Sequence, residues 1–283
     1  AKRFASEHGV PRPHGSYREL VEDDEVDAVY VATPHPMHRE DTILALRAGK
    51  AVLCEKPFAM NHEEAAEMVA VAREEKRFLM EAMWSRFLPS RRKVKELLTE
   101  GTIGDLRMVQ ADFGFRANPD PTSRLFDPQL GGGELLDVGI YPVSLSSFLF
   151  GRQPDRIAAF AEIGDTGVDE QAGILFRYPD GELAVLATAV RTTTPHEATI
   201  IGTEGYIRLH GPWWRGAEGM TLHLAGKEPE RLEVPPVGNG YNYEADEVCR
   251  CLQSGALESD HMSLDESLEI MKTLDAIRAQ WGL

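Results

Sequence analysis

Lys56 is the residue of this sequence best placed for chemistry. It follows a short apolar run, 51–54, that is typical of a buried strand, and Pro57 comes directly after it. Because proline restricts the backbone at this point, the ammonium group is expected to project from the carboxyl end of the strand. A partly buried ammonium can polarise a hydroxyl or carbonyl oxygen. The alternative is a surface lysine that only pairs with Glu55.

A second chemical pair lies in the segment 134–151, which reads as a helix. Asp137 and Tyr141 are four residues apart and therefore share a helix face, and Gly139 removes a side chain between them. These two residues are either a capping aspartate and a core tyrosine, or a carboxylate and a phenol close to Lys56. In the second case the ammonium would lower the pKa of Tyr141 and make it a competent proton relay.

Polar residues also end the other strands predicted in the first part of the chain. The segment 26–33 has a continuous apolar character, which predicts a strand buried on both faces, and 78–84 reads as a further strand. Helices alternate with these strands, which indicates a parallel sheet, and ligands of such sheets bind beyond the carboxyl ends of the strands. The polar strand ends are Thr33-Pro34-His35, Glu55-Lys56-Pro57, and Glu81 with Trp84 and Arg86. Trp84 can form the floor under a sugar or an aromatic ring.

The sequence changes character after residue 88. Several strand-like segments follow one another without intervening helices, separated by turn signals such as 179–181 and 202–205. We therefore predict two domains, an α/β domain with a parallel sheet over 1–88 and an α+β domain with a large, mostly antiparallel open sheet over 89–283. The last segment, 263–282, reads as an amphipathic helix with a capping box formed by Ser263 and Glu266.

Composition excludes several classes of partner. The chain has 283 residues, 42% of them apolar, and a formal net charge of −16, which disfavours nucleic acid and anionic membranes as partners. Three cysteines, Cys54, Cys249 and Cys251, do not make a disulfide framework, which indicates reduced thiols and a cytoplasmic protein. No apolar run has the length of a membrane span.

Two further motifs are incomplete. His35 and His38 have a spacing that suits a metal, but no third ligand lies nearby in the sequence, so no metal site is predicted. The glycine run 131–133 lacks the preceding strand and the following Lys-Ser/Thr of a phosphate loop, and it reads as a flexible lead-in to the helix.

Taken in order along the chain, these motifs resemble a known family. It is the glucose-fructose oxidoreductase/inositol dehydrogenase (Gfo/Idh/MocA) family, and within it the branch of dihydrodiol dehydrogenases and NADP-dependent D-xylose dehydrogenases. The resemblance runs nearly end to end and rests on the segments VYVATPHPMHRED, AGKAVLCEKP, MEAMWSRFLP and RLFDPQLGGGELLDVGIYPV.

The resemblance implies a Rossmann domain, a C-terminal α/β domain and hydride transfer between a nicotinamide cofactor and an alcohol carbon of a sugar, polyol or cyclic trans-diol. It implies NADP as the cofactor, with NAD possible, and a homodimer or homotetramer formed through the C-terminal sheet. Lys56 and Tyr141 take the catalytic positions, with Asp137 as a helper carboxylate. The cofactor-lining residues are Thr33, Pro34, His35, His38, Glu55, Lys56 and Pro57, and the substrate residues are Trp84, Arg86 and Arg124.

One part of the family pattern is not found in the sequence. A Rossmann domain opens with a strand, a G-x-G-x-x-G turn and a helix, whereas this sequence starts within what reads as a later helix, closed by Gly9. We therefore expect the sequence to be a fragment of a longer protein, whose missing unit chooses between NAD and NADP. A non-catalytic ligand sensor of the same fold is the alternative function, although retention of both Lys56 and Tyr141 argues against it.

Overall fold

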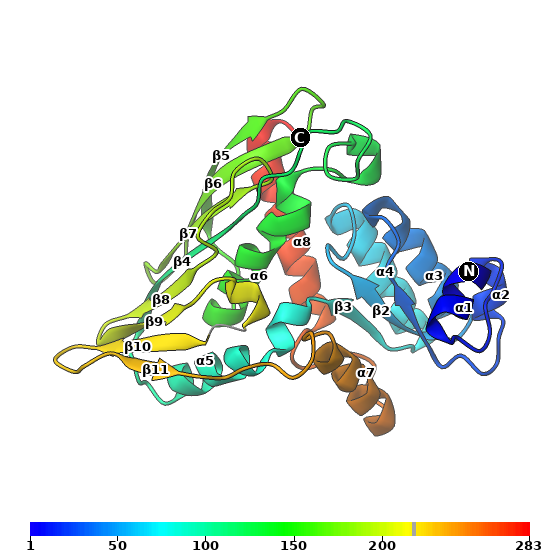
Figure 1. The fold of residues 1–283 in the computed structure, drawn as a ribbon, viewed down its shortest axis with the longest axis horizontal. Coiled ribbons are helices and arrows are strands. Elements are labelled where there is room, and N and C mark those ends of the chain that lie inside the picture. The colour runs from blue at the N-terminus through cyan, green and yellow to red at the C-terminus, as the bar shows by residue number, and fades with distance from the viewer. Residues whose placement is uncertain (217–218) are drawn as a thin grey trace.

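The computed structural model describes residues 1–216 and 219–283, which form two sheets and the helices around them (Figure 1). The helices are α1 Lys2–His8, α2 Tyr17–Val21, α3 His38–Arg47, α4 His62–Glu75, α5 Pro89–Thr99, α6 Ile140–Phe150, α7 Asn242–Ser254 and α8 Leu264–Trp281. The strands are β1 Ala28–Val31, β2 Ala51–Glu55, β3 Leu79–Ala82, β4 Leu106–Gly114, β5 Arg156–Ile163, β6 Asp169–Arg177, β7 Leu183–Ala189, β8 Ala198–Gly202, β9 Gly205–Leu209, β10 Met220–Leu224 and β11 Glu230–Leu232.

The first sheet is parallel, as predicted, and its strands lie in the order β1-β2-β3. Its central strand β2 is buried because strands pair with it on both edges and helices pack near it. The prediction that the strand in 26–33 is buried on both faces is wrong. Within the described residues β1 is an edge strand, and Ala28 and Tyr30, which share one face, are exposed while Val31 is buried.

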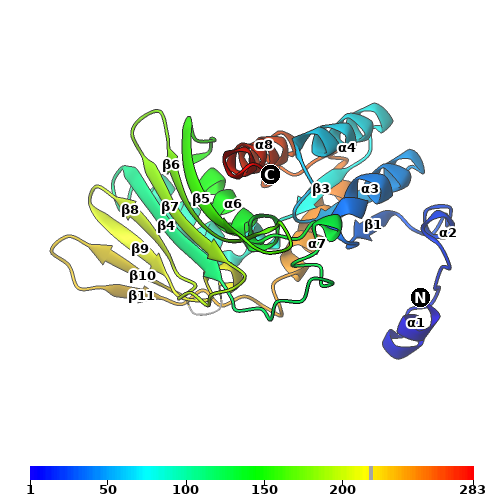
Figure 2. The same ribbon diagram turned by 90° about the horizontal axis from the view of Figure 1, so that it is seen from above.

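The second sheet has eight strands in the order β11-β10-β9-β8-β4-β7-β6-β5. All neighbouring pairs are antiparallel except β4 and β7, which confirms the predicted open and mostly antiparallel sheet. In Figures 1 and 2, α6 and α8 lie between this sheet and the helices α3 and α4, while no labelled helix covers the other sheet face.

Local sequence explains where the main helices begin. Asn61 caps α4, because its Oδ1 accepts the backbone N–H of Glu64 at 2.9 Å, and Ser263 caps α8 in the same way through Glu266. The reciprocal half of the predicted capping box is absent: the Glu266 carboxylate contacts Arg86 at 2.6 Å and accepts the Ser147 hydroxyl at 2.6 Å. The start of α8 is therefore tied to two other parts of the fold.

The segment predicted as one helix over 134–151 has two parts. Leu135–Gly139 is a π-helical turn, and α6 continues from it without a break. Asp169 at the start of β6 supports this turn, since its Oδ2 accepts the backbone N–H of Leu135 at 2.7 Å. The turn carries Asp137 to the edge of the first sheet, where β2 ends.

Candidate active site

The Lys56 side chain lies where the first sheet meets the second half of the chain. It follows β2, and its peptide bond to Pro57 is cis. Its Nζ donates to the backbone oxygen of Asp137 at 2.7 Å and lies 3.7 Å from the carboxylate Oδ1 of the same residue. The same Nζ lies 4.9 Å from the centre of the Tyr141 ring. Lys56, Asp137 and Tyr141 therefore meet in space, although 81 residues separate the first two.

Asp137 is held between two cations. Its Oδ1 lies 2.7 Å from Nη1 of Arg124, which comes from the loop before the π-helical turn, and Lys56 faces it from the other side. Burial alone would raise the pKa of Asp137, but Lys56 and Arg124 outweigh this effect and hold the pKa below its ordinary value. Asp137 is thus a fixed negative charge that orients the Lys56 ammonium.

The Tyr141 hydroxyl is fixed by Trp84. The indole Nε1 donates to this oxygen at 2.9 Å, so the phenol keeps its own proton free for another acceptor. The predicted lowering of the Tyr141 pKa is wrong. Burial raises that pKa above its ordinary value, and the hydrogen bond from Trp84 offsets this only in part. Lys56 approaches the ring face of Tyr141, where a cation–π contact forms.

A cleft of about 370 Å³ opens in front of Lys56, at the carboxyl ends of β1 and β2. It is lined by Ala32, Thr33, Pro34, His35, His38, Glu55, Lys56, Arg124, Leu130 and Asp137. The structure therefore brings together most of the residues predicted for cofactor binding, and it adds Arg124. Trp84 and Tyr141 lie behind Lys56 and are nearly buried, at 4% and 7% exposed.

Two histidines organise the wall of this cleft. The ring nitrogens of His38 lie 2.9 Å from the carbonyl oxygens of Thr33 and Pro57, so the residue joins the segments that follow β1 and β2. Burial, together with the nearby Lys56 charge, lowers the pKa of His35 to about 4, which makes its imidazole neutral at physiological pH. Among residues 1–216 and 219–283, no group of three or more histidine, cysteine, aspartate or glutamate side chains is arranged to hold a metal.

Glu55 faces a second carboxyl group across the site. Its side chain accepts the Tyr30 hydroxyl and, at 3.0 Å, the backbone N–H of Lys56. Glu244 on α7 is almost fully buried, and burial together with the Glu55 charge raises the pKa of Glu244 to about 9. Glu244 is consequently a neutral carboxylic acid near pH 7.

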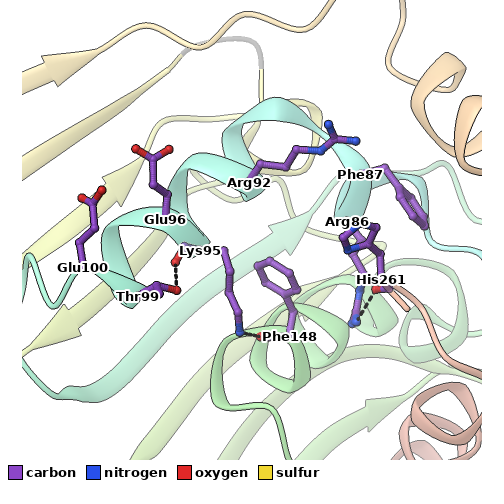
Figure 3. Close-up of a pocket in the computed structure, with 9 residues that line it drawn as sticks. All are labelled: Arg86, Phe87, Arg92, Lys95, Glu96, Thr99, Glu100, Phe148 and His261. Carbon is purple, nitrogen blue, oxygen red and sulfur yellow. Dashed lines mark hydrogen bonds between the residues drawn. The ribbon is translucent and has the colours of Figure 1, made fainter. Parts of the chain in front are cut away.

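Arg86 was predicted to contribute to the substrate cleft, and the structure places it elsewhere. Its guanidinium pairs with Glu266 at 2.6 Å and donates to the backbone oxygen and hydroxyl of Ser144. It lines a separate pocket between α5 and α6, which is drawn in Figure 3. The short turn Trp84–Phe87 points successive side chains in different directions, so Trp84 reaches Tyr141 while Arg86 faces Glu266.

Sequence reasoning missed the aromatic residues that hold the Trp84–Tyr141 pair. Tyr241 stacks on Trp84 with ring centres 4.7 Å apart, and Phe113 meets Tyr141 edge-on at 5.2 Å. Both come from distant segments, at the start of α7 and on β4. The only local signal is the position of Tyr241 after a glycine-rich turn, 238–240.

Comparison with known families matches both halves of the chain. The model described as "Oxidoreductase family, NAD-binding Rossmann fold" covers residues 1–83, and the "GFO/IDH/MocA C-terminal domain" model covers residues 91–208. The chain belongs to the Gfo/Idh/MocA oxidoreductase family. It is thus an NAD(P)-dependent oxidoreductase with a Rossmann-type first half, which confirms the predicted family, fold class and reaction class.

Relatives along the whole chain carry names that describe dehydrogenases. The trans-1,2-dihydrobenzene-1,2-diol dehydrogenases of Mus musculus and Xenopus tropicalis are 39% and 37% identical over 292 aligned residues, which cover all of this chain and 86% and 87% of theirs. The predicted alternative of a non-catalytic sensor finds no support in these names. The domain boundary at 88/89 stays a prediction.

Solved structures of the family have the same fold. Aldose-aldose oxidoreductase from Caulobacter crescentus, complexed with glycerol, has a TM-score of 0.90 and 27% identity, over 100% of this chain and 87% of that one. KijD10, a 3-ketoreductase from Actinomadura kijaniata in complex with NADP and TDP-benzene, has a TM-score of 0.87 and 29% identity, over 99% and 85% of the two chains.

The donor set of the cleft fits the nicotinamide end of such a cofactor and the substrate oxygen beside it. Lys56 carries three N–H donors, and Asp137 supplies the two acceptor atoms that lie near them, so one donor remains for the cleft. The walls contributed by Thr33, Pro34 and His35 place backbone and small polar groups at the strand ends, where open parallel sheets bind ligands. In the described part of the chain, no helix has the length and apolar character that a membrane crossing requires.

Proposed function

We propose that this protein interconverts a secondary alcohol and a ketone, or a sugar hemiacetal and a lactone, with NADP as the preferred cofactor. The substrate class is a cyclic trans-diol or an aldose. The observation that carries the proposal is the contact of Lys56 with both Asp137 and Tyr141 beside the cleft of about 370 Å³. The names of the dihydrodiol dehydrogenases, and the NADP complex of the 3-ketoreductase, support the choice of substrate and cofactor.

In this proposal the cofactor is held by the strand ends. Thr33, Pro34, His35, His38, Glu55 and Pro57 would hold its nicotinamide end. A nicotinamide bound there would supply the hydride acceptor for oxidation of the alcohol and the hydride donor for reduction of the carbonyl. The neutral His35 adds no positive charge of its own at this position, where Lys56 faces the reacting oxygen.

Lys56 and Tyr141 have different roles at the reacting oxygen of the substrate. The Lys56 ammonium stabilises negative charge that develops on the substrate oxygen, because it donates a hydrogen bond in a partly dry site. Tyr141 transfers the proton: its phenol protonates the oxygen during reduction, and its phenolate accepts the proton during oxidation. The N–H of Trp84 stabilises the phenolate, and Asp137 keeps the ammonium in place.

Arg124 is placed to contact the substrate at the cleft entrance. Its side chain is 57% exposed, and it covers Asp137 from the solvent side of the cleft. A substrate hydroxyl can therefore contact the guanidinium without displacing a buried group. We propose Arg124 as a substrate contact, whereas Trp84 acts on the substrate only through Tyr141.

The experiment measures formation of the reduced cofactor, NADPH or NADH, by the protein expressed from its full reading frame. D-xylose, D-glucose and a cyclic trans-diol are compared as substrates, each with NADP and with NAD. We expect Lys56→Ala and Tyr141→Phe each to lower kcat by on the order of 10²–10⁴. The control is Arg116→Ala. Arg116 is an exposed arginine in the loop that also carries Arg124, and its replacement should leave kcat unchanged. Full activity in both site variants would refute the mechanism, and tight NADP binding without turnover on any alcohol would favour a sensor.

We also propose that two or more copies of the chain associate through the open face of the large sheet. Phe160, Leu175 and Val185 are exposed on β5, β6 and β7, at 84%, 42% and 43%. The register places Leu175 opposite Val185, so both project from the same face. An exposed apolar strip on a sheet face without a covering helix is typical of a subunit interface.

A further inference from the structure

A small cavity lies between the turn Trp84–Phe87, α5 and α6, away from the cleft. Its volume is about 10 Å³, which is the space that one water-sized species needs. Ser85, Arg86, Arg91, Ser144, Phe148 and Trp213 line it. A guanidinium pair in so small a space is unusual, because charged groups are seldom buried without partners of opposite charge.

Arg91 is the buried cation of this cavity that lacks a carboxylate. It is 2% exposed, its Nη2 donates to the backbone oxygen of Trp213 at 2.5 Å, and its guanidinium lies 5.2 Å from the Trp213 ring centre. Its Nη1 is buried and finds no hydrogen-bond acceptor among the described residues. Burial lowers the pKa of Arg91 to about 9, so the group keeps its positive charge at physiological pH.

Arg86 adds a second free donor. Its charge is balanced by Glu266 and its two terminal nitrogens are hydrogen-bonded, but its Nε is buried without an acceptor in the described part of the chain. The Ser144 hydroxyl accepts from Arg86 Nη2 at 3.0 Å, which leaves its own proton free to donate. The lining thus offers several donors and one uncompensated positive charge.

We propose that this cavity binds a single halide-sized monovalent anion, held between Arg86 and Arg91. One negative charge neutralises Arg91, and a spherical acceptor can receive N–H and O–H donors from several directions. A water molecule has a suitable size and can accept some of these hydrogen bonds. It leaves the Arg91 charge uncompensated, which is costly in a buried position.

A larger pocket supplies the route to this cavity. It has a volume of about 480 Å³ and shares Arg86 and Phe148 with the inner cavity, and Figure 3 shows these two side chains next to each other. Arg86 lies 5.4 Å from the centre of the Phe148 ring, so the two spaces are adjacent at this pair. Arg92, Lys95, Glu96 and Glu100 also line the outer pocket, so charges of both signs surround it.

The test compares chloride with gluconate, which is too large for the cavity, at constant ionic strength. Screening of the acidic surface is then the same in both salts, and a difference reports a specific site. We expect chloride at a hundredfold excess over its Kd to raise Tm by on the order of 5 °C. Crystals grown in sodium bromide should show one anomalous peak between Arg86 and Arg91.

Two variants test whether the difference in Tm arises at Arg91. Arg91→Met should abolish the difference between chloride and gluconate, whereas Lys93→Met, a cation on the same helix that lines neither pocket, should keep it. Equal Tm values of the wild-type protein in the two salts, with a bromide-free cavity that holds only water, would overturn the proposal. The bromide experiment uses the wild-type protein, so the result does not depend on how the Arg91 variant folds.

Discussion

At the scale of single residues, the charge of each site group depends on the side chains around it, as Lys56 and Arg124 show for Asp137. The strand end at Lys56 and the spacing of Asp137 and Tyr141 left a structural and a functional interpretation open, and the family resemblance favoured one shared site. The pKa of Tyr141 was predicted in the wrong direction. Its direction depends on the aromatic residues around the phenol, Phe113, Trp84 and Tyr241, which come from three separate elements.

The hydrogen bond from Trp84 to Tyr141 leads to the first prediction. Trp84→Phe keeps an aromatic ring but removes the donor that stabilises the phenolate, so the pKa of Tyr141 rises further. Oxidation needs the phenolate, and its rate should therefore increase with pH throughout the neutral range. In the variant this increase is displaced to higher pH, and kcat for oxidation near pH 7 falls about tenfold. A pH profile of kcat measures the displacement.

Trp281→Phe is the matched control for this change. The Nε1 atom of Trp281 is buried and has no hydrogen-bond partner among the described residues, so its replacement removes no hydrogen bond. An unchanged profile in Trp84→Phe, or an equal displacement in both variants, would contradict the role given to Trp84.

At the scale of elements, the Ser263 cap of α8 was visible in the sequence, whereas the packing around it was not. Ser16, Asn61 and Ser263 each accept a backbone N–H from the residue three positions on. The π-helical turn Leu135–Gly139 could not be predicted, because its support comes from Asp169 in a later strand. For the same reason the position of Arg86 was missed, since its partner Glu266 lies at the far end of the chain.

The cap of α8 gives the second prediction. Ser263→Ala removes the acceptor of the Glu266 N–H and should lower the free energy of unfolding by about 1 kcal/mol. Ser254→Ala serves as the control, because the Ser254 hydroxyl donates to the Cys251 oxygen at a helix end and caps no N–H group. Urea unfolding measures both, and a loss in the control as large as that in Ser263→Ala would argue against the cap.

At the scale of the whole molecule, the two-part architecture was readable, but the order of strands was not. Continuous apolar runs and alternating runs distinguish the two sheets in the sequence. The insertion of β4 between β7 and β8 joins residues almost a hundred positions apart, and no local pattern encodes it.

Buried carboxyl groups make the stability of the molecule depend on pH. The folded-state pKa is about 7 for Glu81 and about 9 for Glu244, and burial is the main cause of the increase in both. An unfolded chain releases these protons near pH 4–5. For each group, the folded state binds more protons than the unfolded state at any pH between its unfolded-state and folded-state pKa values. The contribution of these groups to stability is therefore highest below about pH 4 and falls as pH rises.

The third prediction follows from this sign. The free energy of unfolding should decrease between pH 5 and pH 8, with a slope of up to about 1.4 kcal/mol per pH unit for each group. Glu244→Gln should reduce the slope, while Glu228→Gln, at an exposed position, should not. Urea unfolding at several pH values measures the slopes, and identical slopes in wild type and Glu244→Gln would exclude this cause.

The open face of the large sheet gives the fourth prediction. Phe160→Lys should shift the protein toward smaller assemblies in sedimentation velocity, because it places a charge in the proposed interface. Phe4→Lys changes an exposed phenylalanine on α1, far from this sheet in Figures 1 and 2, and should leave the assembly unchanged. A wild-type protein that is monomeric at all concentrations tested would contradict the interface itself.

The position of α8 has a consequence for how the protein is made. This helix packs on α4 and β3 of the first half, and it anchors there through Asp275, which accepts the His62 N–H, and Arg278, which donates to the Met60 oxygen. During synthesis, residues 264–281 leave the ribosome only after the strands of both sheets have emerged. The apolar side of α4 therefore stays uncovered while both sheets are already outside, which is the interval in which a nascent chain of this type depends most on chaperones.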